Sequence, residues 1–250
     1  MKRSFSFSNN GFEVTACYDD RAINDIFIPL LRKWTDMFRR ENRRIIIFLS
    51  APPGTGKTTL AAFLEHLSKS AENVEPLQAI GLDGFHYHQD YILSHEALID
   101  GVTVPMAKVK GSPETFDLEK LKSKLAELRI TDPLWPVYDR NLHDVREDAV
   151  RVKGNIVLLE GNWFLSTEGG WKELIKECDD SIFITAHEVD LWQRLVERKI
   201  SGGLRKDEAE AFVRNSDLRN IRRLLKYHHR ARTELLMTSD GNFERYLPKS

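Results

Sequence analysis

The chain has 250 residues, enough for one large α/β domain or for one domain with a modest accessory part. Hydrophobic residues make up 41% of it and charged residues 30%, a balance that excludes a largely disordered chain. Its 37 Lys and Arg against 38 Asp and Glu give a net charge of −1. That charge excludes a surface that binds polyanions everywhere and disfavours nucleic acid as a partner, while a local basic face stays open.

Cysteine usage and hydropathy predict a cytoplasmic protein without a membrane segment. Cys17 and Cys178 lie far apart and lack CxxC spacing, so we expect buried free thiols rather than a disulfide framework or a zinc site. The longest apolar run, residues 45–49, is far shorter than the ~20 residues that span a bilayer. The Ser-Phe alternation after the basic start predicts a strand and not a signal peptide.

The first 43 residues predict a hairpin followed by a helix. Aromatic residues alternate on both sides of Asn10-Gly11, a hairpin turn signal, within residues 4–18. Apolar residues then recur at helical spacing over residues 22–38. Pro29 lies inside that pattern and is expected to kink or divide the helix. We expect this N-terminal extension, residues 1–43, to pack against the edge of a sheet.

After residue 44, predicted strands alternate with predicted helices. Strand followed by helix, repeated, is typical of a mainly parallel sheet in an α/β fold. The predicted strands cover residues 45–49, 77–82, 156–159, 181–185 and 243–247. The predicted helices cover residues 58–70, 118–128, 171–177, 191–200 and 208–237. Residues 84–116 form a long irregular region, which in a compact domain is usually functional.

A phosphate-binding loop follows the first central strand. The segment Ala51–Thr58 fits the P-loop pattern, with Ala in place of the first Gly. Gly54 and Gly56 allow the backbone N–H groups to turn toward phosphate oxygens, Lys57 reaches the β- and γ-phosphates, and the Thr58 hydroxyl binds Mg²⁺. The pattern therefore predicts ATP and Mg²⁺ as cofactors. The residues expected to hold the nucleotide are Pro53, Gly54, Thr55, Gly56, Lys57, Thr58 and Thr59.

Two further predicted strands end in a carboxylate. Asp83 follows one strand and Glu160 closes another, and ligands of parallel sheets bind at the carboxyl ends of strands. Asp83-Gly84 is also a common Asx turn. Beside a P-loop we favour the functional interpretation, in which Asp83 accepts the proton of an attacking hydroxyl and Glu160 holds Mg²⁺ directly or through water.

Four motifs follow the P-loop in a recognisable order: Gly81–Tyr87, Lys110–Asp117, Pro136–Arg140 and Leu159–Gly161. Together they resemble the uridine kinase, pantothenate kinase and phosphoribulokinase group of P-loop kinases. The resemblance is nearest to its bacterial nucleoside/nucleotide kinase branch, which is fructose-transport-kinase-like. It implies a three-layer α/β/α P-loop kinase domain over residues 44–250, with residues 84–116 as the acceptor-binding region.

The same resemblance implies roles for single residues. Asp83 matches the catalytic base and Glu160 the Walker-B acid of these kinases. Arg140 departs from uridine kinases and is shared with the sugar-kinase-like branch, which weakens the case for a nucleoside acceptor. The residues expected to contact the acceptor are Asp83, Tyr87, Glu114, Tyr138, Arg140 and His143.

A lid is expected at residues 194–206. Arg194 and Arg198 lie one helical turn apart on one face, ahead of two glycines and Arg205. In the related kinases such arginines close over the phosphates, so Arg194 and Arg198 are candidate catalytic residues beside Lys57 and Asp83. Arg198 and Arg205 are expected to contact the nucleotide. A solvated helix face with a glycine C-cap is the alternative.

These patterns predict an ATP-dependent phosphotransferase. Its acceptor would be a hydroxyl of a small metabolite, of the nucleoside, pantothenate-like, sugar or glycerate type. The alternative is a nucleotide-dependent switch or assembly ATPase with a protein or nucleic-acid partner. ATP hydrolysis that no added metabolite accelerates would identify that alternative. The sequence leaves a homodimer open.

Overall fold

A six-stranded sheet forms the centre of the computed structural model, which describes residues 2–9, 12–99 and 101–246. The strand order is β12-β11-β10-β3-β9-β4, and all neighbours are parallel except the antiparallel pair β11 and β12. The strands are β3 (Ile45–Ser50), β4 (Leu77–Gly81), β9 (Ile156–Gly161), β10 (Asp180–Ala186), β11 (Thr233–Met237) and β12 (Phe243–Arg245). The predicted mainly parallel sheet is confirmed.

Strand β3 shows why the fold has three layers. All six of its residues are buried, as expected when both faces of a parallel sheet are covered. Ile45, Ile47 and Leu49 belong to one hydrophobic core, while Ile46 and Phe48 belong to another. Because successive side chains of a strand point to opposite faces, the two cores lie on opposite sides of the sheet.

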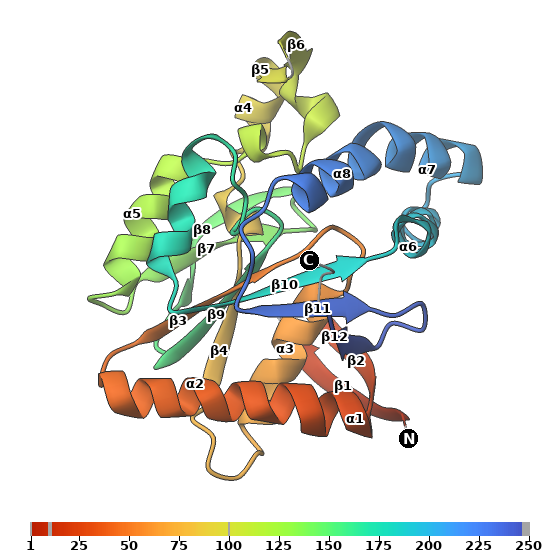
Figure 1. Ribbon diagram of the computed structural model, residues 1–250. Coiled ribbons are helices and arrows are strands. Elements are labelled where there is room, and N and C mark those ends of the chain that lie inside the picture. Colours follow the sequence, from red (N-terminus) through yellow and green to blue (C-terminus); the bar gives the residue numbers. More distant parts are fainter. Residues whose placement is uncertain (1, 10–11, 100, 247–250) are drawn as a thin grey trace.

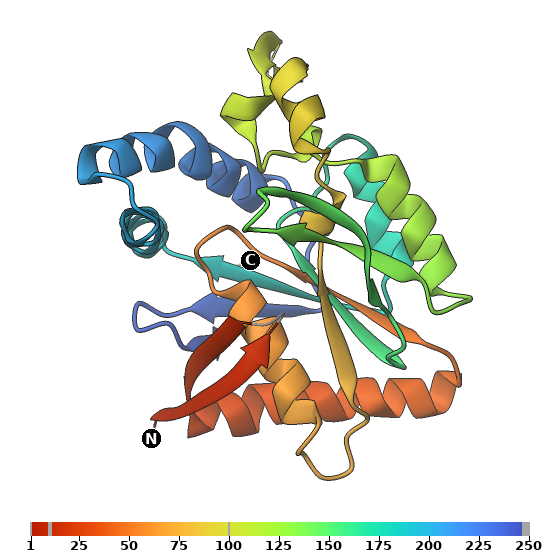
Figure 2. The same cartoon turned by 180° about the vertical axis from the view of Figure 1, so that it is seen from behind.

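Different elements cover the two faces (Figures 1 and 2). The first core includes residues of α2 (Ile28–Glu41), α3 (Lys57–Ser68), α6 (Glu188–Ser201) and α7 (Lys206–Phe212). The second includes residues of α5 (Leu118–Leu128) and of the 3-10 helix η5 (Gly169–Glu177). This arrangement is the expected three-layer α/β/α P-loop kinase fold.

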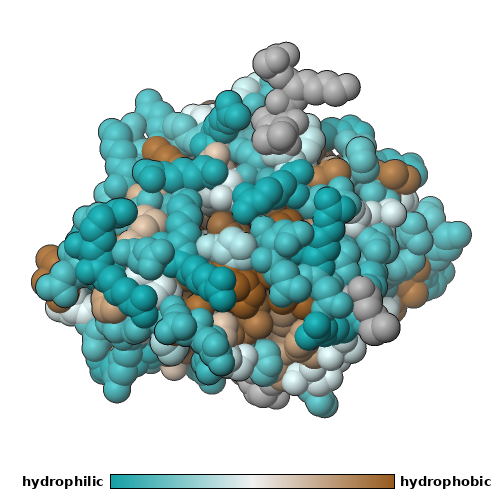
Figure 3. Space-filling view, turned by 60° about the horizontal axis from the view of Figure 1, so that its bottom comes forward, coloured by the Kyte–Doolittle hydropathy of each residue, from teal (hydrophilic) through white to brown (hydrophobic). Residues whose placement is uncertain are grey.

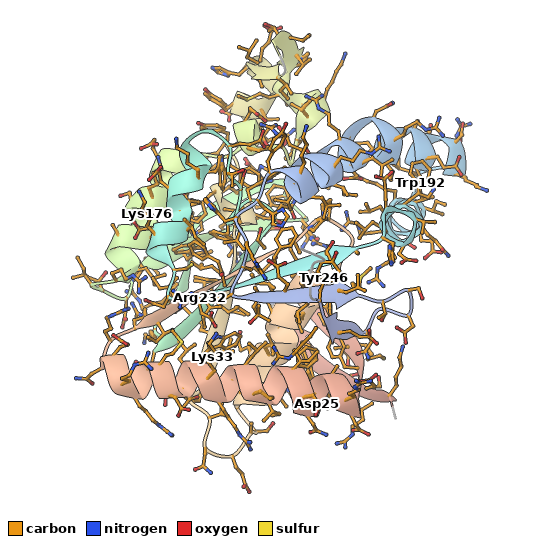
Figure 4. All side chains as sticks on the ribbon, viewed as in Figure 1. Asp25, Lys33, Lys176, Trp192, Arg232 and Tyr246 are labelled. Carbon is orange, nitrogen blue, oxygen red and sulfur yellow. The ribbon has the colours of Figure 1, made fainter. Side chains whose placement is uncertain are left out.

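Helix α2 of the N-terminal extension packs on a face of the sheet, so the expected place at the sheet edge is wrong for this helix, whereas Tyr18 contacts Phe243 of the edge strand β12. Trp34 on α2 is fully buried, and its Nε1 donates to Asp180 Oδ2 at 2.6 Å. Lys33, labelled in Figure 4, contacts the same oxygen at 2.7 Å. Burying Trp34 against the sheet removes more apolar surface from water than an edge contact could. The division at residues 43/44 stays a prediction, and the first core extends across it.

The predicted hairpin is confirmed as β1 (Lys2–Asn9) paired with β2 (Phe12–Asp19), although its Asn10-Gly11 turn lies outside the described residues. The predicted helix is divided, as expected. A short α1 (Asp20–Ala22) and a π-helical turn, η1 (Ile23–Phe27), precede α2, whose first turn contains Pro29. Cys17 is exposed and Cys178 half-buried. The prediction of buried thiols is wrong for Cys17, because Ala16 and Tyr18 take the buried face of β2.

The helix predicted over residues 208–237 is wrong in its last part. Helix α7, a π-helical turn η6 (Val213–Asp217) and α8 (Leu218–Lys226) account for the first part. The chain then leaves the helix and returns as β11, which pairs in parallel with β10. Burial alternates along β11, so its apolar residues follow a strand period and extend the sheet. Of the last predicted strand, residues 243–245 form β12, and residue 247 lies outside the described residues.

The region of residues 84–116 has regular structure that was not predicted. It contains α4 (Gln89–Ser94), an antiparallel hairpin of β5 (Glu96–Ile99) and β6 (Val102–Pro105), and the 3-10 turns η2 (Asp83–Phe85), η3 (Met106–Val109) and η4 (Pro113–Thr115). A small core of its own holds Ile92, Ala97, Ile99 and Met106. A second unpredicted hairpin joins β7 (Leu134–Asp139) to β8 (Asp144–Arg151).

The outer surface is mainly polar. The face in Figure 3 is mostly hydrophilic, with hydrophobic side chains showing in gaps between the charged ones. Within residues 2–9, 12–99 and 101–246, every helix is too short or too polar to cross a membrane.

Candidate active site

The P-loop connects β3 to α3 and has the backbone form that phosphate binding requires. Gly54 and Gly56 adopt φ values of 89° and 78°, which side chains with a Cβ disfavour. The Thr55 hydroxyl donates to the carbonyl of Pro52 at 2.9 Å and closes the loop. Helix α3 begins at Lys57, so the positive end of its dipole faces the loop. The loop and the helix together form an anion-binding cradle.

A hydroxyl and a carboxylate meet beside this cradle. Thr58 Oγ1 donates to Glu160 Oε1 at 2.9 Å, and Glu160 ends the adjacent strand β9. Burial raises the pKa of Glu160, and the charge of Asp83 adds to that effect, whereas the Lys57 ammonium and the Thr58 hydroxyl oppose it. A hydroxyl and a carboxylate oxygen at a phosphate site are the hard ligands that Mg²⁺ prefers, so this pair fits the ion.

Asp83 lies at the end of the next strand. Gly81 pairs with Glu160 in the register of β4 and β9, which places Asp83, two residues further on, near the Glu160 carboxylate. The Asp83 side chain is exposed. Gly84 packs so tightly against β7 that a Cβ there would lie 2.0 Å from the Pro136 carbonyl oxygen. Strand β7 therefore fixes the turn that carries Asp83.

A cavity of about 1090 Å³ separates the P-loop from the β7–β8 hairpin. Its lining includes nine of the predicted site residues and several that were not predicted. The predicted ones are Gly54, Gly56, Lys57, Thr58, Thr59, Tyr138, Arg140, Arg194 and Arg198. The others include Val14 of β2, Asp139, Asn141, Arg146 and Glu197.

The three arginines of the expected lid have different surroundings. Arg194 Nε donates to the Gly54 carbonyl at 2.8 Å and so ties α6 to the P-loop. Arg198 also lines the cavity, and among the described residues its side chain makes no hydrogen bond or ion pair. Arg205 stands outside the cavity lining at the start of α7, where it contacts Asp207 at 2.9 Å and Glu208 at 3.5 Å.

Four predicted acceptor residues lie outside the cavity lining: Asp83, Tyr87, Glu114 and His143. Both carboxylate oxygens of Glu114 accept from Arg223, at 2.7 and 3.1 Å. Burial alone would raise the pKa of Glu114, but the Arg223 hydrogen bonds lower it overall. Tyr87 stacks on Tyr91 with ring centroids 4.5 Å apart. His143 is exposed in the turn of the β7–β8 hairpin, with φ of 54°.

Lys110 and His86, which were not among the predicted site residues, lie outside the cavity lining but beside Tyr138, which belongs to it. Lys110 Nζ donates to Gln89 Oε1 at 2.6 Å and to the Tyr138 hydroxyl at 3.0 Å. The His86 ring stacks on Phe116 at 3.8 Å, and burial lowers the pKa of His86, against the opposing charge of Asp83. Lys110 lies in the Lys110–Asp117 motif and His86 in the Gly81–Tyr87 motif, so these two motifs were the sequence signal that could have identified them. Nothing in those motifs indicated that Lys110 reaches Tyr138 on β7.

The P-loop follows a central parallel strand, and carboxylates stand at the ends of the next two strands of the sheet. Proteins named uridine kinase and pantothenate kinase match this chain. The chain is therefore a P-loop kinase of the uridine kinase and pantothenate kinase group. No protein-family model matches it. The chain belongs to the family of the Escherichia coli (strain K12) protein YggC, an uncharacterized protein with which it is 38% identical over 235 residues, 94% of this chain and 95% of YggC.

Two further relatives agree with this assignment. A candidate uridine kinase of Schizosaccharomyces pombe (strain 972 / ATCC 24843), C227.14, is 29% identical over 189 residues, which cover 73% of this chain and 78% of that protein. The crystal structure of a candidate fructose transport system kinase from Silicibacter sp. TM1040 superposes with a TM-score of 0.72 at 27% identity, covering 82% of this chain and 96% of that one. The fold and the kinase class of the chain follow from these similarities.

Proposed function

We propose that this kinase transfers the γ-phosphoryl group of ATP to a hydroxyl of a small cytoplasmic metabolite. The observation that carries the proposal is the convergence of the P-loop, Glu160 and Asp83 at the ends of three neighbouring strands, β3, β9 and β4. The kinase names of its relatives support it and disfavour a switch or assembly ATPase.

The nucleotide would bind in the P-loop half of the cavity. The backbone N–H groups of residues 54–59 would surround the β-phosphate, and Lys57 would reach the γ-phosphate. Thr58 and Glu160 would hold Mg²⁺, which supplies charge neutralisation between the β- and γ-phosphates. Arg198, whose side chain is open to the cavity, would contact the transferring group, and Arg205 would need to move with α7 to reach it.

Asp83 would act on the acceptor. The hydroxyl oxygen of the acceptor forms a bond to the γ-phosphorus while the bond from that phosphorus to the β–γ bridging oxygen breaks. The hydroxyl proton passes to the Asp83 carboxylate, and ADP leaves with the bridging oxygen. Tyr138 and Arg140 would contact the acceptor from β7. Tyr87, Glu114 and His143 would join them only if their present surroundings rearranged.

The test is the Asp83→Asn variant. Removing the base keeps the P-loop intact, so ATP binding should be retained while turnover falls by about 10²–10⁴-fold. Titration with an unreactive ATP analogue measures the first quantity, and ADP release with a panel of nucleosides, pantothenate, sugars and glycerate measures the second. Asp90→Asn, at an exposed aspartate seven residues further on, is the matched control and should behave as wild type.

A companion variant separates binding from catalysis. Lys57→Ala removes a charge that faces the triphosphate, so it should weaken binding of the ATP analogue itself. Near-normal phosphotransfer by Asp83→Asn would refute the assignment of the base. Hydrolysis of ATP that no member of the panel accelerates would favour the ATPase alternative.

A further inference from the structure

Two cations that the nucleotide half does not use stand at the acceptor side: Arg140 lines the cavity, and Lys110 contacts the Tyr138 hydroxyl, which belongs to a lining residue. We propose that the acceptor carries an acidic group, a carboxylate or a phosphate, which Lys110 and Arg140 recognise. This inference rests on the proposed function, because it concerns the second substrate of the same site.

Arg140 is the first of the two cations. It lines the cavity from the end of β7, is exposed, and makes no hydrogen bond or ion pair within the described part of the chain. Its neighbour Arg146 on β8 lies 3.9 Å from Asp139, so the hairpin pairs one arginine and leaves the other open. The charge of Arg140 acts on the Glu160 carboxylate, which places it near the reacting groups.

Lys110 is the second cation. It is half-buried, yet its two hydrogen-bond partners, the Gln89 amide oxygen and the Tyr138 hydroxyl, are both neutral. A partly desolvated ammonium gains most from an anion, and within residues 2–9, 12–99 and 101–246 no carboxylate lies within ion-pair distance of it. Its charge acts on His86, on which Asp83 acts as well. Lys110 therefore lies toward the acceptor end of the site.

Tyr138 connects the two cations. Lys110 contacts its hydroxyl and lies 4.8 Å above its ring, and Arg140 follows two residues later, just after the end of β7. Tyr138 and Arg140 line the same cavity. An anion bound beside Tyr138 would thus lie close to Lys110 Nζ, in the same cavity that Arg140 lines.

Glu114, the acidic residue that would bind the hydroxyls of a neutral polyol, is already paired with an arginine. Arg223 binds both oxygens of Glu114 and also donates to Glu168 at 2.7 Å. The carboxylate expected to accept hydroxyl hydrogen bonds is therefore neutralised, while the charge of Lys110 meets only neutral partners and Arg140 makes no ion pair within the described residues. This distribution of charge favours an acid over a neutral nucleoside or sugar.

The first experiment measures anion binding without turnover. The protein is saturated with an unreactive ATP analogue and Mg²⁺, which fills the triphosphate site, and inorganic phosphate is then titrated by calorimetry. Phosphate should still bind, and Arg140→Ala and Lys110→Met should each weaken that binding at least about tenfold, since each removes one charged contact. Lys108→Met and Arg151→Ala, at exposed cations of the same segment and of the same hairpin, should leave it unchanged.

The outcomes separate the two proposals. Failure of the analogue to bind refutes the proposed function. Binding of the analogue without any binding of phosphate, or phosphate binding that neither Arg140→Ala nor Lys110→Met changes, refutes the present inference alone. Arg140 is exposed, so Arg140→Ala tests the idea even if Lys110→Met unfolds.

The second experiment compares acceptors that differ only in the acidic group. Glycerate is paired with glycerol, pantothenate with its alcohol, and ribose 5-phosphate with ribose, and ADP release is measured for each. The acidic member of a pair should be preferred at least about tenfold, and Arg140→Ala should remove the preference through KM rather than kcat. A neutral member used as well as its acidic partner would overturn the inference.

Discussion

The two walls of the cavity are built in different ways. The P-loop wall is one continuous stretch, residues 51–59, whose glycines, lysine and threonines lie next to each other in the chain. The opposite wall is assembled from distant segments: Lys110 reaches Tyr138, and Gly84 packs against Pro136. The nucleotide half therefore depends on local sequence, whereas the acceptor half depends on the packing of β7 against the turn after β4.

Among the substitutions that test this difference between the two walls, we expect the largest effect at Glu160. The Glu160→Gln variant loses a Mg²⁺ ligand or its orienting carboxylate, so activity should fall about 10–100-fold or more. It also removes a carboxylate whose charged form is disfavoured by burial. The melting temperature at neutral pH should therefore rise, by about 2–4 °C for each 1 kcal/mol gained. Kinetic assays and thermal unfolding measure the two effects, and a fall in both activity and melting temperature would contradict the prediction.

The stability gain should depend on pH. Because the pKa of Glu160 is higher in the folded protein than in the unfolded chain, the folded state binds more protons between the two values. The wild type is thus stabilised by this group in acid and loses that stability as pH rises through the folded-state pKa. The difference in melting temperature between Glu160→Gln and wild type should grow from mildly acidic to neutral pH.

The second prediction tests the packing of the acceptor wall. In Gly84→Ala the new Cβ would lie 2.0 Å from the Pro136 carbonyl oxygen, so β7 must shift. We expect a loss of about 1–3 kcal/mol in the free energy of unfolding and a larger rise in KM for the acceptor than for ATP. Gly169→Ala is the control, since a Cβ there meets nothing within 4 Å and its φ of 49° costs only backbone strain. Equal changes in both KM values would show that the two walls are not independent.

The smallest effect is expected on the P-loop wall, at Arg194. Its Nε supports the Gly54 carbonyl, so Arg194→Ala should raise KM for ATP about tenfold, the value of one charge-assisted hydrogen bond. If Arg194 acts mainly by holding the loop, kcat should change little. A matching fall in kcat and kcat/KM would instead assign Arg194 to the transferring phosphoryl group.

Local patterns account for what the sequence predicted well. The buried run at residues 45–49 and the glycines of the P-loop carry their own signal, because continuous apolar strands and positive φ angles restrict residue choice. Strand ends at Asp83 and Glu160 could be placed for the same reason. Their closeness follows from the adjacency of β9 and β4 in the sheet.

The acceptor side was harder to predict because its contacts are not local. Strand β7 contains Pro136, and β8 is largely polar and exposed, so neither gave a strand signal. The pairing of Glu114 with Arg223 joins residues 109 positions apart, which no motif spacing indicates. The helical period of residues 208–226 masked the change to a strand period in β11, since both patterns contain leucine pairs.

The hairpin β1–β2 also contacts a turn near the other end of the described chain. Lys2 Nζ lies 2.9 Å from Asp240 Oδ2, and Asn242 Nδ2 donates to Asp19. Val14 of the same hairpin lines the cavity. During synthesis on the ribosome, this hairpin emerges more than two hundred residues before that turn, so these two contacts form late, whereas Phe5 and Tyr18 can pack against Phe63 of α3 much earlier. The cavity itself can become complete only after Ser201, the last residue of its lining, has been translated.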